Sequence, residues 1–296
     1  MLKQLLFFLL SVNICFGQLP DTDIWLFKIV KEKNNLLIQK GTNITNRPGY
    51  DNQPAFSENG KDIYYVSIGE DKQADILVYS AGNKKTKPFT QKTKTSEYSP
   101  TLSPDKTKIF SVVVLEDSSQ VILALDIKTG TVSSYPSQKT NGMQINSFDS
   151  VGYFTFLNSD TVLYYKLTQP HSLRAVSLRN TADVFIASSP ARGFKAINRY
   201  EFIYGIKDSA KVTFYRYNTV ILKAVKYCEY PSLNEDIVWH PSLGLLKSEG
   251  PLILRFKEAE NKWETLFDFS GSGIKKITRF AFDSAFKQIA IVDNLK

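Results

Sequence analysis

Apolar and polar residues alternate over short stretches along most of the chain. Two clear examples are "ADILVYSAG" (Ala74–Gly82) and "QVILALDIKTG" (Gln120–Gly130), each closed by a glycine. A period of two places the apolar side chains on one face of a strand, and the glycine is typical of a turn. After residue 17, no stretch of ten or more residues has the apolar stripe of a helix. The pattern therefore predicts an all-β protein and argues against an α/β enzyme domain.

One phrase of this pattern occurs twice. "NQPAFSENGKDIYYVS" begins at Asn52 and "YSPTLSPDKTKIFSVVV" begins at Tyr98, so that Pro54 and Pro100 stand 46 positions apart. Each phrase, together with the alternating segment after it, reads as four short strands with turns between them. A repeat of four strands with a period in the forties predicts a β-propeller, because one small sheet needs a neighbour against each of its faces.

The length of the chain predicts six such blades. Removal of residues 1–17 leaves 279 of the 296 residues, which corresponds to about six units of 46. We expect the third blade from "QINSFD", "GYFTFLNS", "TVLYYKLT" and "SLRAVSL", starting at Gln144. The fourth would comprise "ADVFIASS", "RYEFIYGIK", "KVTFYRYN" and "VILKAVKY", starting at Ala182, and the fifth would run from Asp236 to Phe269.

The remaining half-blades lie at the two ends of the chain. "ITRFAFDS" and "QIAIVDN" near the C-terminus supply two strands, and "DIWLFKIV" and "NLLIQKGT" near the N-terminus supply two more. Shared use of one blade by both ends would leave no open sheet edge in the ring. The predicted fold is thus a six-bladed β-propeller with four antiparallel strands per blade, closed by N- and C-terminal strands.

The first 17 residues have the features of a secretory signal peptide. Lys3 precedes an apolar run that starts at Leu5 and is too short to span a bilayer, and Gly17 is a small residue at the expected cleavage point. The alternative is a lipoprotein acylated at Cys15, but bulky Ile14 stands where lipidation favours a small side chain. We therefore expect a single propeller domain over residues 18–296, exported to the periplasm or secreted, without a transmembrane segment.

The distribution of charge argues against a nucleic-acid partner, and the cysteine content argues against a disulfide. The net charge is +8, but the lysines form short clusters in predicted loops, as at Lys84 and Lys85, and an exported protein seldom meets nucleic acid. We expect a solvated basic rim and no nucleic-acid partner. Loss of the signal peptide leaves Cys228 as the single cysteine, so we expect no internal disulfide. A buried, unreactive thiol is the favoured interpretation of Cys228 over a reactive one.

We expect the mature protein to be a monomer.

The duplicated phrase also resembles a known family. "RPGYDNQPAFSENGKDIYYVS" (Arg47–Ser67) and "SEYSPTLSPDKTKIFSV" (Ser96–Val112) are similar to the WD-repeat-like propeller units of TolB-type proteins. Departures from the family pattern include Glu58 and Asn59 in place of Pro and Asp, and Lys106 in place of the turn glycine. The resemblance implies a propeller of the bacterial cell envelope that serves as a protein-binding platform.

Catalytic signals are sparse. The chain has two histidines, His171 and His240, which do not form a spaced metal-binding pair, and it lacks a Gly-x-Ser-x-Gly nucleophile elbow and a twelve-residue calcium loop. We expect no cofactor and no catalytic residue. The alternative is a metal-dependent hydrolase or lyase that holds a divalent cation at the channel mouth.

A candidate binding site follows from the predicted geometry. The first strand of every blade lines the central channel, so residues just before these strands converge on one mouth. The residues in these positions are Tyr50, Asp51, Asn52, Glu97, Tyr98, Asn234, Glu235, Asp236 and Arg279. Their carboxylates and aromatic rings suit a cation, a basic peptide end or a sugar. The structural alternative is that Asp51 and Glu97 only accept backbone hydrogen bonds within turns.

These observations predict a non-catalytic, exported propeller that binds an envelope or secreted protein. Two alternatives remain open: the metal-dependent enzyme described above, and a propeller that binds a glycan or peptide through aromatic faces such as Tyr50, Tyr98 and Trp239.

Overall fold

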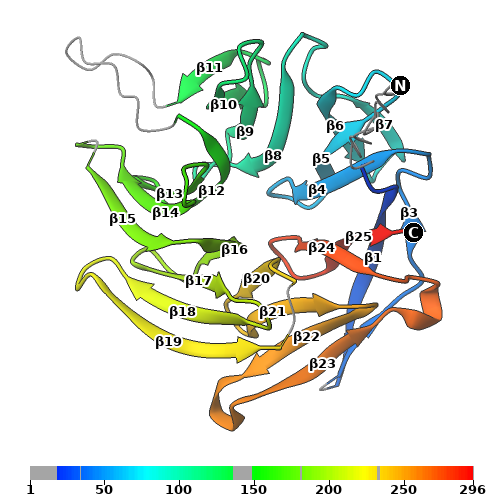
Figure 1. The fold of residues 1–296 in the computed structure, drawn as a ribbon. Helices are drawn as coiled ribbons and strands as arrows, with labels where there is room; N and C mark the ends of the chain where they lie inside the picture. Colours follow the sequence, from blue (N-terminus) through cyan, green and yellow to red (C-terminus); the bar gives the residue numbers. More distant parts are fainter. Residues whose placement is uncertain (1–18, 34, 136–148, 181, 232–233, 296) are drawn as a thin grey trace, which may run out of the picture.

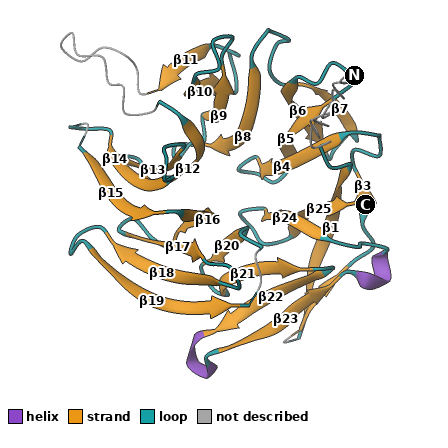
Figure 2. Cartoon of the chain, viewed as in Figure 1, coloured by secondary structure: helices purple, strands orange, loops and turns teal. Residues whose placement is uncertain are grey.

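The computed structural model describes residues 19–33, 35–135, 149–180, 182–231 and 234–295. The predicted signal peptide, the alternative lipidation site Cys15 and the expected start of the third blade at Gln144 lie outside these residues. The described part consists of β-strands and connecting turns, and its helical elements are the 3₁₀ turns Glu258–Glu260 and Ser270–Ser272 (Figure 2). The expectation of an all-β protein is confirmed.

Four sheets of the described chain contain four antiparallel strands each. One comprises β8 (Ser96–Leu102), β9 (Lys108–Val114), β10 (Gln120–Asp126) and β11 (Val132–Tyr135). The next comprises β12 (Val151–Asn158), β13 (Thr161–Lys166), β14 (Ser172–Ser177) and β15 (Asp183–Ser188). A third comprises β16 (Pro190–Ala196), β17 (Glu201–Lys207), β18 (Val212–Asn218) and β19 (Lys223–Tyr230). The fourth comprises β20 (Ile237–His240), β21 (Gly244–Glu249), β22 (Leu252–Lys257) and β23 (Lys262–Asp268).

A further sheet of nine strands has two parts. One part comprises β4 (Tyr50–Phe56), β5 (Asp62–Ile68), β6 (Ala74–Ser80) and β7 (Lys85–Pro88). The other comprises β24 (Ile277–Phe282), β25 (Gln288–Asn294), β1 (Thr22–Glu32), β2 (Asn35–Ile38) and the short β3 (Thr42–Asn43). A single parallel pair, Thr22 with Tyr50, connects the two parts.

The two ends of the chain share a sheet. β1 pairs antiparallel with β25 from Thr22 opposite Asn294 to Lys28 opposite Gln288, and its other edge pairs with β2 and β3. The first strand of the described chain therefore lies between the last strand and the strands that follow it, with hydrogen-bonding partners on both sides.

The third and fourth repeat units differ from the predicted ones by one strand. "GYFTFLN" lies in β12, the first strand of its sheet rather than the second, and Asp183–Ser188 is the fourth strand of that sheet rather than the first strand of the next. The next sheet begins instead with Pro190–Ala196. The repeat is degenerate in this region, and the strand lengths alone did not show where one sheet ends and the next begins.

The sheets are arranged around a common centre (Figure 1). Six strands lie nearest that centre, and neighbouring ones contact each other in the order β4, β8, β12, β16, β20 and β24, with β24 also in contact with β4. The outer strands of each sheet, such as β7, β19 and β23, lie toward the periphery (Figure 1).

Hydrophobic cores fill the spaces between adjacent sheets. One cluster joins Phe27 and Ile289 of the shared sheet to Leu246 and Ile253 of the neighbouring sheet. The ring of Phe27 is fully buried and meets Phe269 edge to face, with 4.8 Å between the ring centroids. Each sheet is thus stabilised by apolar burial against its neighbours, which is the requirement that the repeat pattern implies.

Across the described residues, the structure contains no helix with the length and apolar character needed to traverse a bilayer.

The packing of Phe27 predicts a large effect on stability. Phe27→Ala removes a fully buried ring between two sheets, and we expect the free energy of unfolding to fall by about 3–5 kcal/mol. Urea unfolding measures this change. The matched control is Leu37→Ala on β2, whose side chain is 43% exposed and which should cost less than about 1 kcal/mol. Equal losses in the two variants would contradict the described packing.

Candidate functional site

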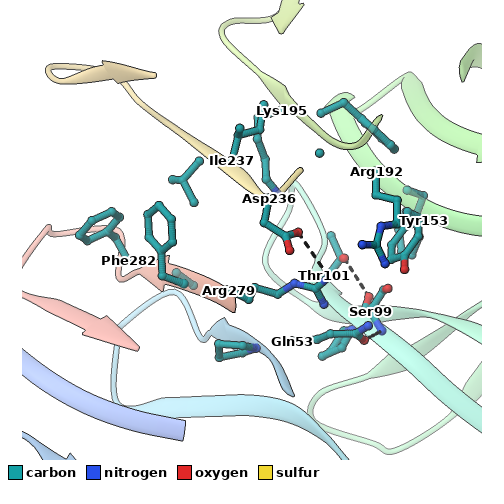
Figure 3. Close-up of a pocket in the computed structure, with 18 residues that line it drawn as sticks. Gln53, Ser99, Thr101, Tyr153, Arg192, Lys195, Asp236, Ile237, Arg279 and Phe282 are labelled. Carbon is teal, nitrogen blue, oxygen red and sulfur yellow. Dashed lines mark hydrogen bonds and ion pairs between the residues drawn. The ribbon is translucent and has the colours of Figure 1, made fainter. Parts of the chain in front are cut away.

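A cavity of about 310 Å³ lies where the six inner strands meet. Every inner strand contributes to its wall (Figure 3). Polar side chains come from β4, β8, β12, β16 and β24, and from the residue directly before β20. The polar lining residues are Gln53, Ser99, Thr101, Tyr153, Arg192, Lys195, Asp236 and Arg279. The cavity therefore joins residues that are far apart in the sequence.

Irregular pairing at the inner strands exposes these side chains to the cavity. The pairing of β4 with β5 shifts between Asn52 and Ala55, and that of β8 with β9 shifts between Tyr98 and Thr101. At each shift one residue adopts a left-handed backbone, Gln53 with φ 58° and Ser99 with φ 56°. A bulge of this kind turns a side chain out of the regular alternation. The duplicated phrase thus encodes a duplicated bulge.

The two bulges are also bonded to each other. The backbone N–H of Ser99 donates to Oε1 of Gln53 at 2.5 Å, which connects positions 46 residues apart. This bond fixes the amide of Gln53 at the cavity wall and couples two neighbouring sheets.

Gly193 allows β16 and β20 to approach closely. A Cβ atom at this position would lie 2.0 Å from the carbonyl oxygen of Glu235, a distance that no side chain tolerates. The backbone N–H of the preceding Arg192 donates to the carboxylate of Glu235 at 2.8 Å. The glycine therefore places Arg192 and Lys195, on either side of it, at the cavity wall.

The charge of the cavity is predominantly positive. Arg192, Lys195 and Arg279 line it together with one carboxylate, Asp236. Nη2 of Arg279 lies 3.3 Å from Oδ1 of Asp236, so this pair is neutral overall (Figure 3). Arg192 and Lys195 are left to give the lining its net positive charge.

Glu235 does not cancel this charge completely. Its carboxylate accepts hydrogen bonds from Arg192 at 3.3 Å and from Lys207 at 2.7 Å. One negative charge is thus shared between two positive charges. Burial lowers the pKa of Lys195 below its ordinary value; Asp236 partly opposes this shift and Arg279 adds to it. An anion in the cavity would provide the counter-charge that Lys195 lacks. The arrangement thus favours an anionic ligand over a cation.

Of the nine predicted site residues, Asp236 and Arg279 line the cavity. Tyr50 does not line the cavity; burial raises the pKa of its phenol, and the charge of Arg279 opposes the rise. Glu235 lies behind the wall and holds Arg192. These four residues come from three different inner-strand regions, and two of them, Asp236 and Arg279, line the cavity.

Asp51 and Asn52 lie elsewhere. The side chain of Asp51 is fully buried, and its Oδ1 accepts from Nη2 of Arg47 at 2.7 Å. The backbone carbonyl of Asp51 accepts from Oγ1 of Thr22, which connects β4 to β1. Asn52 is buried and accepts from the N–H of Gln53 at 2.7 Å. Both side chains support the strand contacts and do not line the cavity.

The remaining predicted residues also make contacts within the fold. Glu97 is buried and accepts from the hydroxyls of Thr95 at 2.9 Å and Thr90 at 3.4 Å. Tyr98 packs against apolar clusters of adjacent sheets, and the amide of Asn234 donates to the carbonyl of Ser248 at 2.9 Å. None of these three belongs to the cavity lining.

Sequence reasoning missed Tyr153, Arg192 and Lys195. Tyr153 lies on β12, which the repeat pattern predicts as the second strand of its blade, and Arg192 and Lys195 lie on β16, which it does not predict as a strand. The available signal was "PARGFKA", in which a glycine stands between two cations in a short strand.

The two histidines pack against aromatic rings, and the cysteine is buried. His240 packs against Phe286 with 4.3 Å between ring centroids, and burial lowers its pKa. His171 packs against Tyr165 at 5.1 Å. Cys228 is buried, and burial raises the pKa of its thiol, as is expected of an unreactive cysteine. No cluster of three or more His, Cys, Asp or Glu residues suited to a metal ion occurs within the described ranges.

Comparison with protein-family models and with curated protein sequences finds no match to this chain. Solved structures do match. One described as TolB from Agrobacterium tumefaciens has a TM-score of 0.65 at 12% identity and covers 94% of this chain and 99% of its own. A gluconolactonase from Xanthomonas campestris has a TM-score of 0.62 at 10% identity, with 90% and 94% covered. An oligogalacturonate lyase from Vibrio parahaemolyticus has a TM-score of 0.55 at 13% identity, with 88% and 83% covered.

These likenesses concern the fold. The chain has a TolB-like β-propeller fold, as the duplicated phrase indicates. The matched structures include proteins named as TolB, as a gluconolactonase and as an oligogalacturonate lyase, so function has to be argued from the site.

Glu97 provides a pH-dependent prediction. Burial raises the pKa of Glu97 from 4.5 to about 7, so the folded protein holds this proton more tightly than the unfolded chain does. The contribution of Glu97 to stability is therefore fully present below pH 4.5 and is lost as the pH rises through about 7. We expect Glu97→Gln to raise the free energy of unfolding by about 2 kcal/mol at pH 8, after allowance for solvent screening, and to leave it nearly unchanged at pH 4.

Urea unfolding at the two pH values measures this effect. Glu70→Gln, at an exposed position, is the matched control and should show no pH-dependent difference from the natural chain. A Glu97→Gln variant that is equally or less stable at pH 8 would show that the carboxylate is needed in its ionised form.

Proposed function

We propose that this protein is an exported, closed six-bladed propeller of the bacterial cell envelope that binds another protein without covalent chemistry. In this proposal the central cavity receives an acidic segment or a C-terminal carboxylate of the partner. The observation that carries the proposal is the convergence of Arg192, Lys195 and Arg279 on a cavity whose lining contains a single carboxylate, Asp236.

The pairing at the chain ends supports the closed ring. The nine-stranded sheet divides at the single Thr22–Tyr50 pair into a unit of four strands (β4–β7) and a unit of five, in which the short β3 accompanies β24, β25, β1 and β2; together with the four separate sheets these units would make six blades. The inner strands contact one another in cyclic order, from β4 through β24 and back to β4. A sheet that contains both chain ends is the arrangement that fastens such a ring.

The chemistry of the cavity supports an anionic group. Hydrogen bonds to charged partners contribute about 1.5–3 kcal/mol each, and they are stronger where the surroundings exclude water. Arg192 and Lys195 can donate to one carboxylate, while Gln53, Ser99 and Tyr153 offer neutral groups for its orientation. The basic peptide end or cation that the predicted carboxylates suggested is less well matched, because Asp236 is already paired with Arg279.

A protein ligand in the envelope is supported by two features. The fold resembles TolB, and residues 1–17 have the pattern of a signal peptide. The proposal retains a monomeric propeller with no cofactor and no nucleic-acid partner. The protein would act in the periplasm or outside the cell.

An acidic sugar is the second candidate ligand. The matched oligogalacturonate lyase and gluconolactonase are carbohydrate enzymes with the same fold, and the positive lining of the cavity would also suit a uronate carboxylate. Incubation with oligogalacturonate and D-glucono-lactone, with and without added manganese or calcium, tests this candidate. Turnover of either compound would replace the proposed function with catalysis.

The proposed function is tested by capture and by charge removal. The chain from residue 18 serves as bait in an envelope extract, and binding of the captured protein is then measured by calorimetry. In Arg192→Gln/Lys195→Gln, we expect affinity to fall at least tenfold for each removed cation, because each loses a charge-assisted hydrogen bond. The pair Asp236–Arg279 is left intact in this variant.

The matched control removes the same charge far from the cavity. Lys84→Gln/Lys87→Gln alters two exposed lysines near the peripheral strand β7 and should leave affinity nearly unchanged. If the two double variants lose affinity equally, net charge explains the binding and the cavity does not. Capture of a partner whose affinity is insensitive to both variants would place its site elsewhere on the propeller.

A further inference from the structure

The turn between β18 and β19 presents three consecutive aliphatic side chains to solvent. Val220 and Ile221 are each 66% exposed and Leu222 is 65% exposed, which makes this turn the most exposed apolar segment of the described chain. Single exposed apolar residues are ordinary, but three in succession at the tip of a turn are not. Their exposure therefore indicates a surface with a binding role.

The turn is held rigidly in this position. The side chain of Asn218 accepts from the N–H of Val220 at 2.9 Å and of Ile221 at 3.2 Å. The backbone N–H and the hydroxyl of Thr219 both donate to the carbonyl of Tyr200, at 2.9 Å and 3.0 Å. The aliphatic tip is thus presented without the entropic cost of ordering a loose loop.

Leu222 is an unusual residue at this position of the turn, because the backbone there has a positive φ. Its φ is 50°, in the left-handed region that favours glycine or asparagine. A leucine here is strained and, being 65% exposed, recovers little by burial within the fold. The geometry of the turn therefore does not explain why a leucine occupies this position. Contact of the exposed side chain with an apolar phase does explain it.

Positive charge surrounds the aliphatic tip. Lys223 follows it directly and is exposed, and Arg199 lines the adjacent groove together with Val220 and Leu222. Neither Arg199 nor Lys223 forms an ion pair with a described residue. The guanidinium of Arg199 stacks on the ring of Tyr200, with 4.8 Å between Cζ and the ring centroid. The acids beside them are already engaged: Asp160 by Arg179 and Glu201 by Arg216. The surface is therefore apolar at its tip and cationic around it.

We propose that the β18–β19 turn docks the propeller on an anionic lipid surface. Val220, Ile221 and Leu222 would enter the boundary between headgroups and acyl chains, and Arg199 and Lys223 would lie at the level of the lipid phosphates. Apolar insertion combined with cations nearby is the combination that favours anionic membranes. This proposal is independent of the central cavity, because the turn joins the outer strands of the β16–β19 sheet and contributes no residue to the cavity lining.

A lipid surface fits the turn better than a peptide ligand. The neighbouring groove between β14, β15 and the turn includes Val184 and Ile186 and has a volume of about 690 Å³, but Ile221 does not line it. A peptide in the groove would leave Ile221 in water, whereas a planar apolar phase covers all three aliphatic side chains. The uncompensated cations are likewise matched by lipid phosphates.

Co-sedimentation with lipid vesicles tests the proposal on the chain from residue 18. We expect binding to vesicles of phosphatidylcholine mixed with phosphatidylglycerol and much weaker binding to pure phosphatidylcholine. Val220→Ser/Ile221→Ser/Leu222→Asn should reduce the partition coefficient by at least about tenfold. Asparagine is chosen for Leu222 because it tolerates a positive φ.

A second variant keeps the test independent of the apolar substitutions. Arg199→Gln/Lys223→Gln should lower partitioning by roughly fivefold for each cation and should reduce its dependence on salt. The matched control, Leu37→Ser/Val132→Ser, removes two exposed aliphatic side chains from other sheets and should leave partitioning unchanged. Thermal unfolding of every variant verifies that it is folded.

The outcomes are distinct. No partitioning of the natural chain, or equal partitioning of the natural chain and the cation variant, would overturn the proposal. Loss of vesicle binding in the control as well as in the turn variants would attribute binding to general surface hydrophobicity and would also overturn it. Capture of the envelope partner by the turn variant should persist, so that failure of this proposal and failure of the proposed function are separately visible.

Discussion

The structure depends on the burial of both faces of every small sheet against its neighbours. A four-stranded sheet cannot enclose a core by itself, and the apolar clusters of this chain lie between sheets rather than within one. Phe27 illustrates the constraint, because its ring is buried only when the shared sheet meets the sheet of β20–β23. The same requirement brings six inner strands to one centre and creates the cavity there.

Much of the fold could be predicted from the sequence because each repeat must bury both faces of its sheet, and this requirement recurs along the chain. The spacing of Pro54 and Pro100, and the glycine that closes each alternating segment, identify strands and turns in the first two repeats. The strands of Ile24–Val30 and Gln288–Asp293 also pair as expected. In the third and fourth repeats the turn residues are degenerate, and strands of equal length and alternation fit two registers equally well. Burial against a particular neighbour decides between them, and a single sequence does not contain that information directly.

The candidate site was less predictable than the fold because it depends on bulges. Regular alternation would place Asn52 or Tyr98 toward the centre, yet the shifts in pairing turn out Gln53 and Ser99 instead. A displacement of one residue changes which side chain faces the cavity. The carboxylates Asp51 and Glu97 consequently fall among buried contacts, whereas cations on β16 occupy the wall. The predicted acidic mouth and the observed positive cavity therefore differ for two reasons: the bulges in β4 and β8 change which side chains face the centre, and the repeat pattern does not identify β16, which supplies Arg192 and Lys195.

The position of β1 between β25 and β2 has a consequence for the order of events in folding. One edge of β1 can pair soon after synthesis, with β2 and β3, but its other edge has no native neighbour until β25, more than 250 residues later, has been synthesised. Contacts between the two extremes of a sequence form slowly, since closing so long a loop is entropically costly. The propeller therefore reaches its final cooperative state only once β25 is present, and a ribosome-bound or truncated chain that lacks β25 retains an unsatisfied strand edge that is open to incorrect pairing.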